Sequence, residues 1–147
     1  MKSNIEELSQ VDIKQAIDGY SVDWYLQNLV SLANKTQIEM GLTLVVGGSV
    51  VSGTLIGGAK YFDLFAKEIS AAWPFENKDE MRDIFAENGN IYKPSEGGDE
   101  SIPPPHFIHL ADARVHFPDG SLPSNKGVLW RGKLNAVSGF SLGSILR

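Results

Sequence analysis

The chain has 147 residues, and its 42% hydrophobic and 21% charged content is that of an ordinary globular domain large enough to bury a core. It contains no cysteine, which excludes disulfides, thiolate zinc sites and a thiol nucleophile. Its formal net charge of −5 opposes non-specific binding to nucleic acid and to anionic membranes.

Residues 1–18 predict a moderately amphipathic helix, or an arm that becomes ordered on a partner. The first ten residues, MKSNIEELSQ, are partly acidic and lack an apolar centre, so we expect no secretory signal. No apolar run approaches the roughly 20 residues of a membrane span. Together with the lack of cysteine, these features fit a cytoplasmic protein.

A helix is predicted over Val22–Lys35, with the hydroxyl of Ser21 as its N-terminal cap. Apolar residues recur at helical spacing and form a stripe that is expected to pack on a sheet. Trp24 lies beside this stripe, which consists of Val22, Tyr25, Leu26, Leu29 and Ala33.

The next stretch, Met40–Ile56 (MGLTLVVGGSVVSGTLI), predicts a β-hairpin. Apolar residues alternate along its first half, so one face of that strand can lie on a core. Gly47-Gly48-Ser49 separates the halves and can supply the positive φ angles of a tight turn. The glycines at 53, 57 and 58 form neither a phosphate loop nor a dinucleotide fingerprint, and are expected to permit sharp strand bending at positions where a Cβ would clash.

Two further helices are expected, over Ala59–Trp73, which Pro74 ends, and over Asn77–Glu87. Asn77 and Glu80 have the spacing of a capping box. Residues 92–105 contain two adjacent glycines and three consecutive prolines, and predict a loop that we expect to be mobile.

The last third returns to β structure, with strands predicted over Phe107–Val115, Gly127–Leu134 and Val137–Leu142 and a turn-rich connection over 116–125. We therefore expect one domain over residues 1–147. It divides into an N-terminal helix or arm (1–18), a helix plus hairpin (20–56), a helical insertion with a loop (57–105) and the remaining strands (106–147).

Three histidines, His106, His109 and His116, lie close to one another in the sequence, near Asp112. Imidazole and carboxylate ligands would suit a transition metal. However, residues 106 and 109 would point to opposite faces of a strand, because its side-chain period is two. We expect three separate histidines, and we assign no metal, cofactor or catalytic residue.

The segment Trp130-Arg131-Gly132-Lys133 is locally basic and aromatic. Trp130, Arg131 and Lys133 could stack on and neutralise a single-stranded nucleic acid, which makes them candidate interaction residues. The alternative is that the strand buries the indole and leaves the guanidinium in solvent. We favour this alternative.

The order of helix, hairpin, insertion and three strands resembles the Sm-like fold, a small bent five-stranded barrel. The resemblance implies an α+β protein with an Sm-like or SH3-like antiparallel β-barrel, N-terminal helices and a helical insertion between its second and third strands. Arg131-Gly132 lies where RNA-binding Sm-like proteins carry an Arg-Gly pair. The Asp and Asn of their RNA pocket are not recognisable in residues 56–61.

Three strings resemble the gas vesicle accessory protein GvpU family: GLTLVVGGSVVSGTLIGGAKYFDLFA (41–66), FIHLADARVHFPDG (107–120) and GVLWRGKLNAVSGFSLGSI (127–145). This resemblance implies a non-enzymatic cytoplasmic protein that helps to assemble, organise or cluster gas vesicles. Its implied partners are vesicle shell proteins, other accessory proteins and further copies of itself. The alternatives are a nucleic-acid-binding Sm-like module and a small-molecule-binding barrel.

Overall fold

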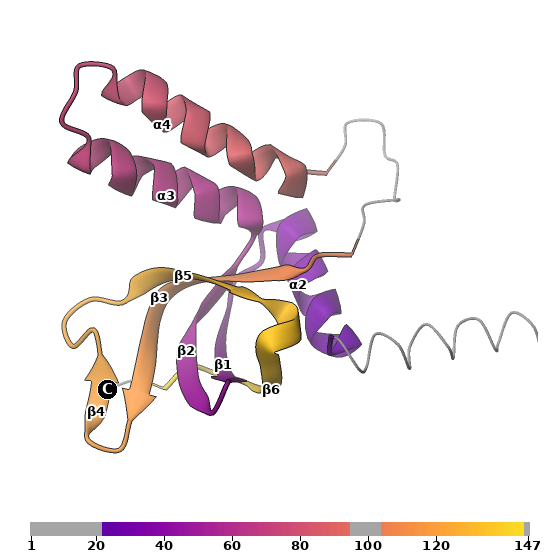
Figure 1. The fold of residues 1–147 in the computed structure, drawn as a ribbon. Coiled ribbons are helices and arrows are strands. Elements are labelled where there is room, and N and C mark those ends of the chain that lie inside the picture. The colour runs from indigo at the N-terminus through magenta and orange to yellow at the C-terminus, as the bar shows by residue number, and fades with distance from the viewer. Residues whose placement is uncertain (1–21, 95–103, 146–147) are drawn as a thin grey trace, which may run out of the picture.

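The computed structural model describes residues 22–94 and 104–145, which form an α+β fold (Figure 1). The described part has three α-helices and a six-stranded antiparallel sheet, with two short 3₁₀ turns. The helices are α2 (Trp24–Thr36), α3 (Gly58–Ala72) and α4 (Lys78–Glu87), and the 3₁₀ turns are η1 (Asn88–Tyr92) and η2 (Leu134–Ala136). The strands are β1 (Met40–Val46), β2 (Ser49–Ile56), β3 (Phe107–Phe117), β4 (Gly120–Leu122), β5 (Val128–Lys133) and β6 (Val137–Leu142).

The sheet has the strand order β4-β3-β2-β1-β6, and β5 pairs with the N-terminal part of β3. The 3₁₀ turn η2 connects β5 directly to β6. Within the described residues no strand pairing joins β5 to β6, so the observed sheet is open. The sequence analysis predicted five strands and missed β4, because its three residues lie within the turn-rich connection.

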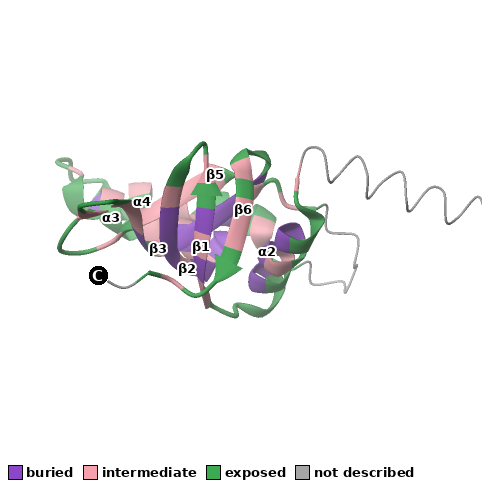
Figure 2. Ribbon diagram, turned by 90° about the horizontal axis from the view of Figure 1, so that it is seen from below, coloured by how far each residue is buried: buried purple, intermediate pink, exposed green. Residues whose placement is uncertain are grey.

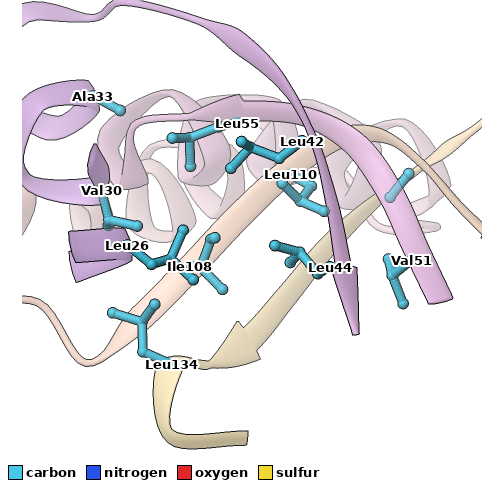
Figure 3. Close-up of a cluster of buried hydrophobic side chains, with 11 residues drawn as sticks. Leu26, Val30, Ala33, Leu42, Leu44, Val51, Leu55, Ile108, Leu110 and Leu134 are labelled. Carbon is cyan, nitrogen blue, oxygen red and sulfur yellow. The ribbon is translucent and has the colours of Figure 1, made fainter. Parts of the chain in front are cut away.

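The predicted hairpin is confirmed as β1 and β2, joined by Gly47 and Gly48 with φ angles of 56° and 82°. Both angles lie in the left-handed region, which glycine adopts at little cost. Leu42 and Leu44 of β1 are fully buried, as the alternating pattern predicted. The two strands curve around the core in Figure 3.

A bulge interrupts β3 at Asp112, which has a φ of 50°. The register between β3 and both of its long neighbours shifts there. Gly53 of β2 passes the bulge so closely that a Cβ at this position would lie 2.9 Å from the carbonyl oxygen of Ala111. The expected clash of a Cβ is therefore confirmed at Gly53.

The helix predicted over Val22–Lys35 is confirmed as α2, but its cap and its buried face differ from the prediction. The carboxylate of Asp23 accepts a hydrogen bond from the backbone N–H of Tyr25 at 2.9 Å, so Asp23 and not Ser21 is the cap. Tyr25 is 57% exposed. The buried face instead includes two polar residues beside three apolar ones: Leu26, Gln27, Val30, Ala33 and Asn34.

The insertion between β2 and β3 is confirmed as α3, α4 and η1. The predicted capping box at Asn77 is wrong, since Asn77 makes no side-chain capping bond. Its side-chain oxygen instead accepts a hydrogen bond from the indole N–H of Trp73 at 2.9 Å. Residues 1–18 and most of the 92–105 loop lie outside the described residues.

The core lies on the inner face of the sheet, where α2 covers the curved strands (Figures 2 and 3). Eleven buried side chains form this cluster: Leu26, Val30, Ala33, Leu42, Leu44, Val51, Leu55, Ile108, Leu110, Ala113 and Leu134. The insertion packs on the opposite, outer face, where Tyr61 of α3 contacts His109 of β3. None of the helices in the described ranges is both long and apolar enough to cross a membrane.

Candidate functional site

The three histidines lie in three separate environments. His106 is exposed, whereas His109 is buried on the outer face of the sheet with 1% of its surface exposed. His116 is half-buried, and its Nε2 shares a hydrogen bond with the hydroxyl of Ser52 at 2.5 Å. Across residues 22–94 and 104–145, no three His, Cys, Asp or Glu side chains are grouped so that they could hold a metal ion.

The structure places Trp130 and Arg131 on opposite faces of β5. Trp130 is paired with Leu110 and packs against the core on the inner face. Arg131 is paired with the buried His109 on the outer face, and Lys133 shares that face but is exposed. The sequence therefore supplies an indole and two cations, but no single surface of the fold presents all three.

The guanidinium of Arg131 lies on aromatic rings rather than in open solvent. Its central carbon is 3.8 Å from the ring centre of Phe107 and 5.5 Å from that of Phe62. These distances are those of cation–π contacts. In the described part of the chain, no carboxylate forms an ion pair with Arg131. Arg131 is thus a half-buried cation that lies against two aromatic rings and, among the described residues, pairs with no carboxylate.

His109 lies in an aromatic cage formed by the insertion. Its ring centre is 4.6 Å from that of Tyr61, 5.2 Å from that of Tyr92 and 6.0 Å from that of Phe62. Neither ring nitrogen has a hydrogen-bond partner among the described residues. Burial, together with the neighbouring Arg131 charge, lowers the pKa of His109 to about 3, so this imidazole is neutral at physiological pH.

Tyr61 belongs to the same cluster, and its pKa is also shifted. Burial raises the pKa of its phenol, the Arg131 charge opposes this rise and the Glu68 carboxylate adds to it. The phenol is therefore un-ionised across the physiological range. The cluster carries one formal charge at its centre, that of Arg131.

A cavity of about 310 Å³ opens beside Arg131. Its wall is mostly apolar, and its lining residues are Asn34, Ile91, Tyr92, Pro104, Pro105, His106, Phe107 and Arg131. Two hydrogen bonds fix one side of it: the Gln27 side chain donates to the Pro105 carbonyl at 2.9 Å, and the Leu134 N–H donates to the His106 carbonyl at 2.9 Å. The cavity is of the size that binds small groups, with a cation at its wall.

A second cavity, of about 370 Å³, lies on the inner face at Trp130. Its lining is almost wholly apolar: Val51, Ala113, Arg114, Val115, Leu122, Pro123, Val128 and Trp130. Leu122 and Val128 are exposed at its rim, and Phe117 is exposed at the end of β3. We call Phe117, Leu122 and Val128 the edge patch, because they lie where the sheet ends at β4 and β5 (Figure 1).

Neither cavity holds a set of groups that defines a reaction, so the geometry alone leaves the class of function open. A comparison with protein-family models decides it, since the model described as gas vesicle protein GvpU-like matches residues 23–145. The chain belongs to the GvpU-like family. This is a gas vesicle accessory family and not a known enzyme family. Searches of curated proteins and of solved structures each find no match.

The match to the GvpU-like family spans both cavities and the whole described sheet. It covers the three strings from which the sequence analysis identified the family resemblance, and confirms it. The matched range also includes the helices α3 and α4.

The packing of Trp130 on Gly132 in this GvpU-like chain can be tested directly. The indole lies over Gly132, and a Cβ at position 132 would overlap the ring. Gly132→Ala is therefore expected to displace the indole and to shift its fluorescence emission to longer wavelength, with roughly 1–2 kcal/mol of destabilisation from overpacking. The measurement uses a Trp24→Phe, Trp73→Phe background, in which Trp130 is the one remaining indole.

Gly139→Ala in the same background is the matched control, because a Cβ at position 139 would meet no atom within 4 Å. Its emission spectrum is expected to stay unchanged. An unchanged spectrum in Gly132→Ala as well would contradict the packing of the indole over Gly132.

The sequence does not predict the aromatic cage. His109 and Arg131 stand out in it for separate reasons, and no local pattern connects either one with Phe62, Tyr92 or Phe107. The alternation of residues along β3 and β5 places His109 and Arg131 on one face only once the register of the two strands is known. Pairing across this much chain is set by tertiary contacts, so the local pattern held no signal for it.

Proposed function

We propose that this protein helps to assemble or cluster gas vesicles in the cytoplasm by binding other proteins. Its partners under this proposal are vesicle shell proteins, other accessory proteins and further copies of itself. The match of residues 23–145 to the GvpU-like family carries the proposal. A non-catalytic role is in keeping with cavities that are mainly apolar and hold no pair of acid and base groups among the described residues.

The edge patch is our candidate contact surface. Phe117, Leu122 and Val128 are exposed, and Leu122 and Val128 line an apolar cavity with Trp130 in its wall. An aromatic anchor beside an apolar pocket is the usual composition of the energetic centre of a protein interface. Trp130, the first of the candidate interaction residues, would then act through this face, away from Arg131 and Lys133.

Self-association is supported by the edges of the sheet. β6 pairs with β1 on one side, and β5 pairs with β3 on one side. In the described part of the chain the other sides of both strands are unpaired, and unpaired edges favour strand addition between copies. We also propose that the fold is a variant of the Sm-like or SH3-like barrel. The support is the strand order β5-β3-β2-β1-β6, with the 3₁₀ turn η2 leading from one edge to the other.

The proposal predicts that the protein floats with purified gas vesicles in a density gradient. Leu122→Asp combined with Val128→Asp is expected to reduce the fraction of the protein that floats with the vesicles about tenfold or more. The reason is that a carboxylate placed in an apolar contact must lose its hydration without gaining a partner. Ile84→Asp is the matched control, since Ile84 is an exposed apolar residue on α4, outside the edge patch. It is expected to float like the unaltered chain.

Light scattering at high protein concentration completes the test, and we expect an oligomer. A monomeric mass together with no retention on vesicles would refute the proposal. If Ile84→Asp weakened retention as strongly as the double substitution, the contact with vesicles would stand, but it would not be assigned to the edge patch.

A nucleic-acid-binding role has no specific support in the geometry, because Trp130 and Arg131 face opposite ways. RNA binding measured at low and high salt would detect it, since phosphate contacts weaken as salt rises. A small-molecule-binding role would use the cavity at Arg131.

A further inference from the structure

The starting point is Arg131, which forms no ion pair with a carboxylate among the described residues. A guanidinium that is partly withdrawn from water is stabilised by an anion that accepts its hydrogen bonds, and a carboxylate does so in a bidentate manner. Phe107 covers one face of the guanidinium, and no described carboxylate reaches it. Arg131 lines the 310 Å³ cavity, which is where such an anion would enter.

The cavity specifies more than an anion. Ile91, Pro104, Pro105 and Phe107 give it an apolar wall, and Tyr92 and His106 are the other titratable residues in the lining. An inorganic ion would leave this apolar surface in contact with water. The group that fits the whole site is a carboxylate carried on a segment that also has apolar side chains.

The start of α2 lies close to this cavity. Gln27 is hydrogen-bonded to Pro105, and Asn34, seven residues further along the same buried face of the helix, lines the cavity. The helix begins at Trp24, three residues or about 4.5 Å of helix rise before Gln27. Residues 1–21 precede this point, and a fully extended chain of this length spans up to roughly 70 Å. The segment is therefore long enough to contact the cavity.

The sequence of this segment complements the cavity. Ile5, Leu8 and Ile13 are apolar, and they are interspersed with the carboxylates of Glu6, Glu7 and Asp12. Gly19 lies between this stretch and α2, at a point where the chain can reverse direction. The segment offers the carboxylate that Arg131 lacks and the apolar side chains that would cover Ile91 and the prolines.

We propose that residues 5–13 of the same molecule dock in the Arg131 cavity, with a carboxylate of the segment paired to Arg131. This contact lies on the outer face of β5, opposite the edge patch. It is therefore independent of the proposed function, and each can fail without the other.

The absence of cysteine from the natural sequence allows a direct test by disulfide trapping. Leu8→Cys is combined with Ile91→Cys at the cavity rim, or with Leu32→Cys on the exposed side of α2 as the matched control. An undocked tether would meet positions 32 and 91 at similar rates. Docking is expected to make the disulfide of the 8/91 pair form about tenfold faster or more, within a monomer, because it raises the local concentration of the segment at the cavity.

The charge is tested in the same 8/91 background. Arg131→Gln is expected to slow the disulfide about fivefold or more, whereas Lys133→Gln, on the same face but exposed, is expected to leave its rate unchanged. If Arg131→Gln impairs folding, the combined change Glu6→Gln, Glu7→Gln and Asp12→Asn removes the charge from the other side of the contact. Those three positions lie outside the described core.

Equal rates for the 8/91 and 8/32 pairs would overturn the proposal. So would a disulfide that forms only between two molecules, which would assign the cavity to a second copy. A rate that responds neither to Arg131→Gln nor to neutralisation of the segment would also overturn it.

Discussion

Gly53→Ala is expected to lower the free energy of unfolding by about 2–3 kcal/mol, as overpacking of a closely packed site does. A Cβ at position 53 would lie 2.9 Å from the carbonyl oxygen of Ala111 and 3.0 Å from the Cα of Ala113. Both are backbone atoms of β3, and they flank the bulge at Asp112, so the neighbour that must move is a strand rather than a flexible side chain. Urea unfolding followed by circular dichroism measures the change.

Gly139→Ala is the control for the general effect of replacing glycine in a strand. No atom lies within 4 Å of its added Cβ, so we expect a change of less than about 1 kcal/mol, with either sign. Equal losses for the two variants would show that the approach of β2 to the bulge is not a steric requirement.

The same bulge bears on the inner cavity. It shifts the register so that Ala113 pairs with Val128, and both line the cavity with Trp130. Gly53→Ala would push on Ala113 of β3, and through it would disturb the candidate contact surface. Vesicle flotation of Gly53→Ala would test this connection.

The second large effect is a loss of stability at acidic pH through His109. Its pKa is about 3 in the folded chain, whereas a histidine in an unfolded chain titrates near 6.5. Between these values the unfolded state binds the extra proton, so the free energy of unfolding falls as the pH drops from about 6.5 towards 3. For a shift of this size, the His109 contribution lost between pH 8 and pH 5 is about 2 kcal/mol.

His109→Leu is expected to remove this contribution, because leucine fills the aromatic cage without a titratable group. The groups that face the imidazole are Tyr61 from α3, Tyr92 from η1 and Arg131 from β5. The measurement is the difference in unfolding free energy between the variant and the unaltered chain at pH 5 and at pH 8. Using this difference cancels the contributions of carboxylates elsewhere.

His106→Gln is the control for the replacement of a histidine, since His106 is exposed and is not part of the aromatic cage. If the His109→Leu difference were constant with pH, the imidazole would have to be hydrated or charged in the folded protein. That result would contradict the closed cage.

The two faces of β5 have different roles in this interpretation. Trp130 contributes to an apolar inner face that ends in the edge patch, while Arg131 contributes a cation to an aromatic outer face. A contiguous motif of four residues is thereby divided between two surfaces. This division replaces the single basic and aromatic surface that a nucleic-acid-binding strand would present.

Most elements follow from the sequence because their signals are local. The alternation in Met40–Val46, the paired glycines of the turn and the helical spacing of residues 59–73 depend on neighbours within a few residues. They correctly predict the hairpin, the insertion and the three long C-terminal strands. The family resemblance is equally a property of the sequence, and the family match confirms it.

Other features depend on competition between distant groups, and only the tertiary structure decided them. Gln27 and Asn34 are polar, yet they are buried on α2, because the Pro105 carbonyl and the Gly58 N–H provide their hydrogen-bond partners. No periodic pattern encodes a partner that lies tens of residues away.

The sequence by itself therefore determined the family, the order of the elements and the alternation that separates Trp130 from Arg131. The tertiary structure decided what each of these side chains meets: the strand register places Arg131 beside His109, and the insertion closes the aromatic cage over both. The physical reason is that periodicity fixes which way a side chain points, whereas burial and loss of charge depend on which other elements pack against that face.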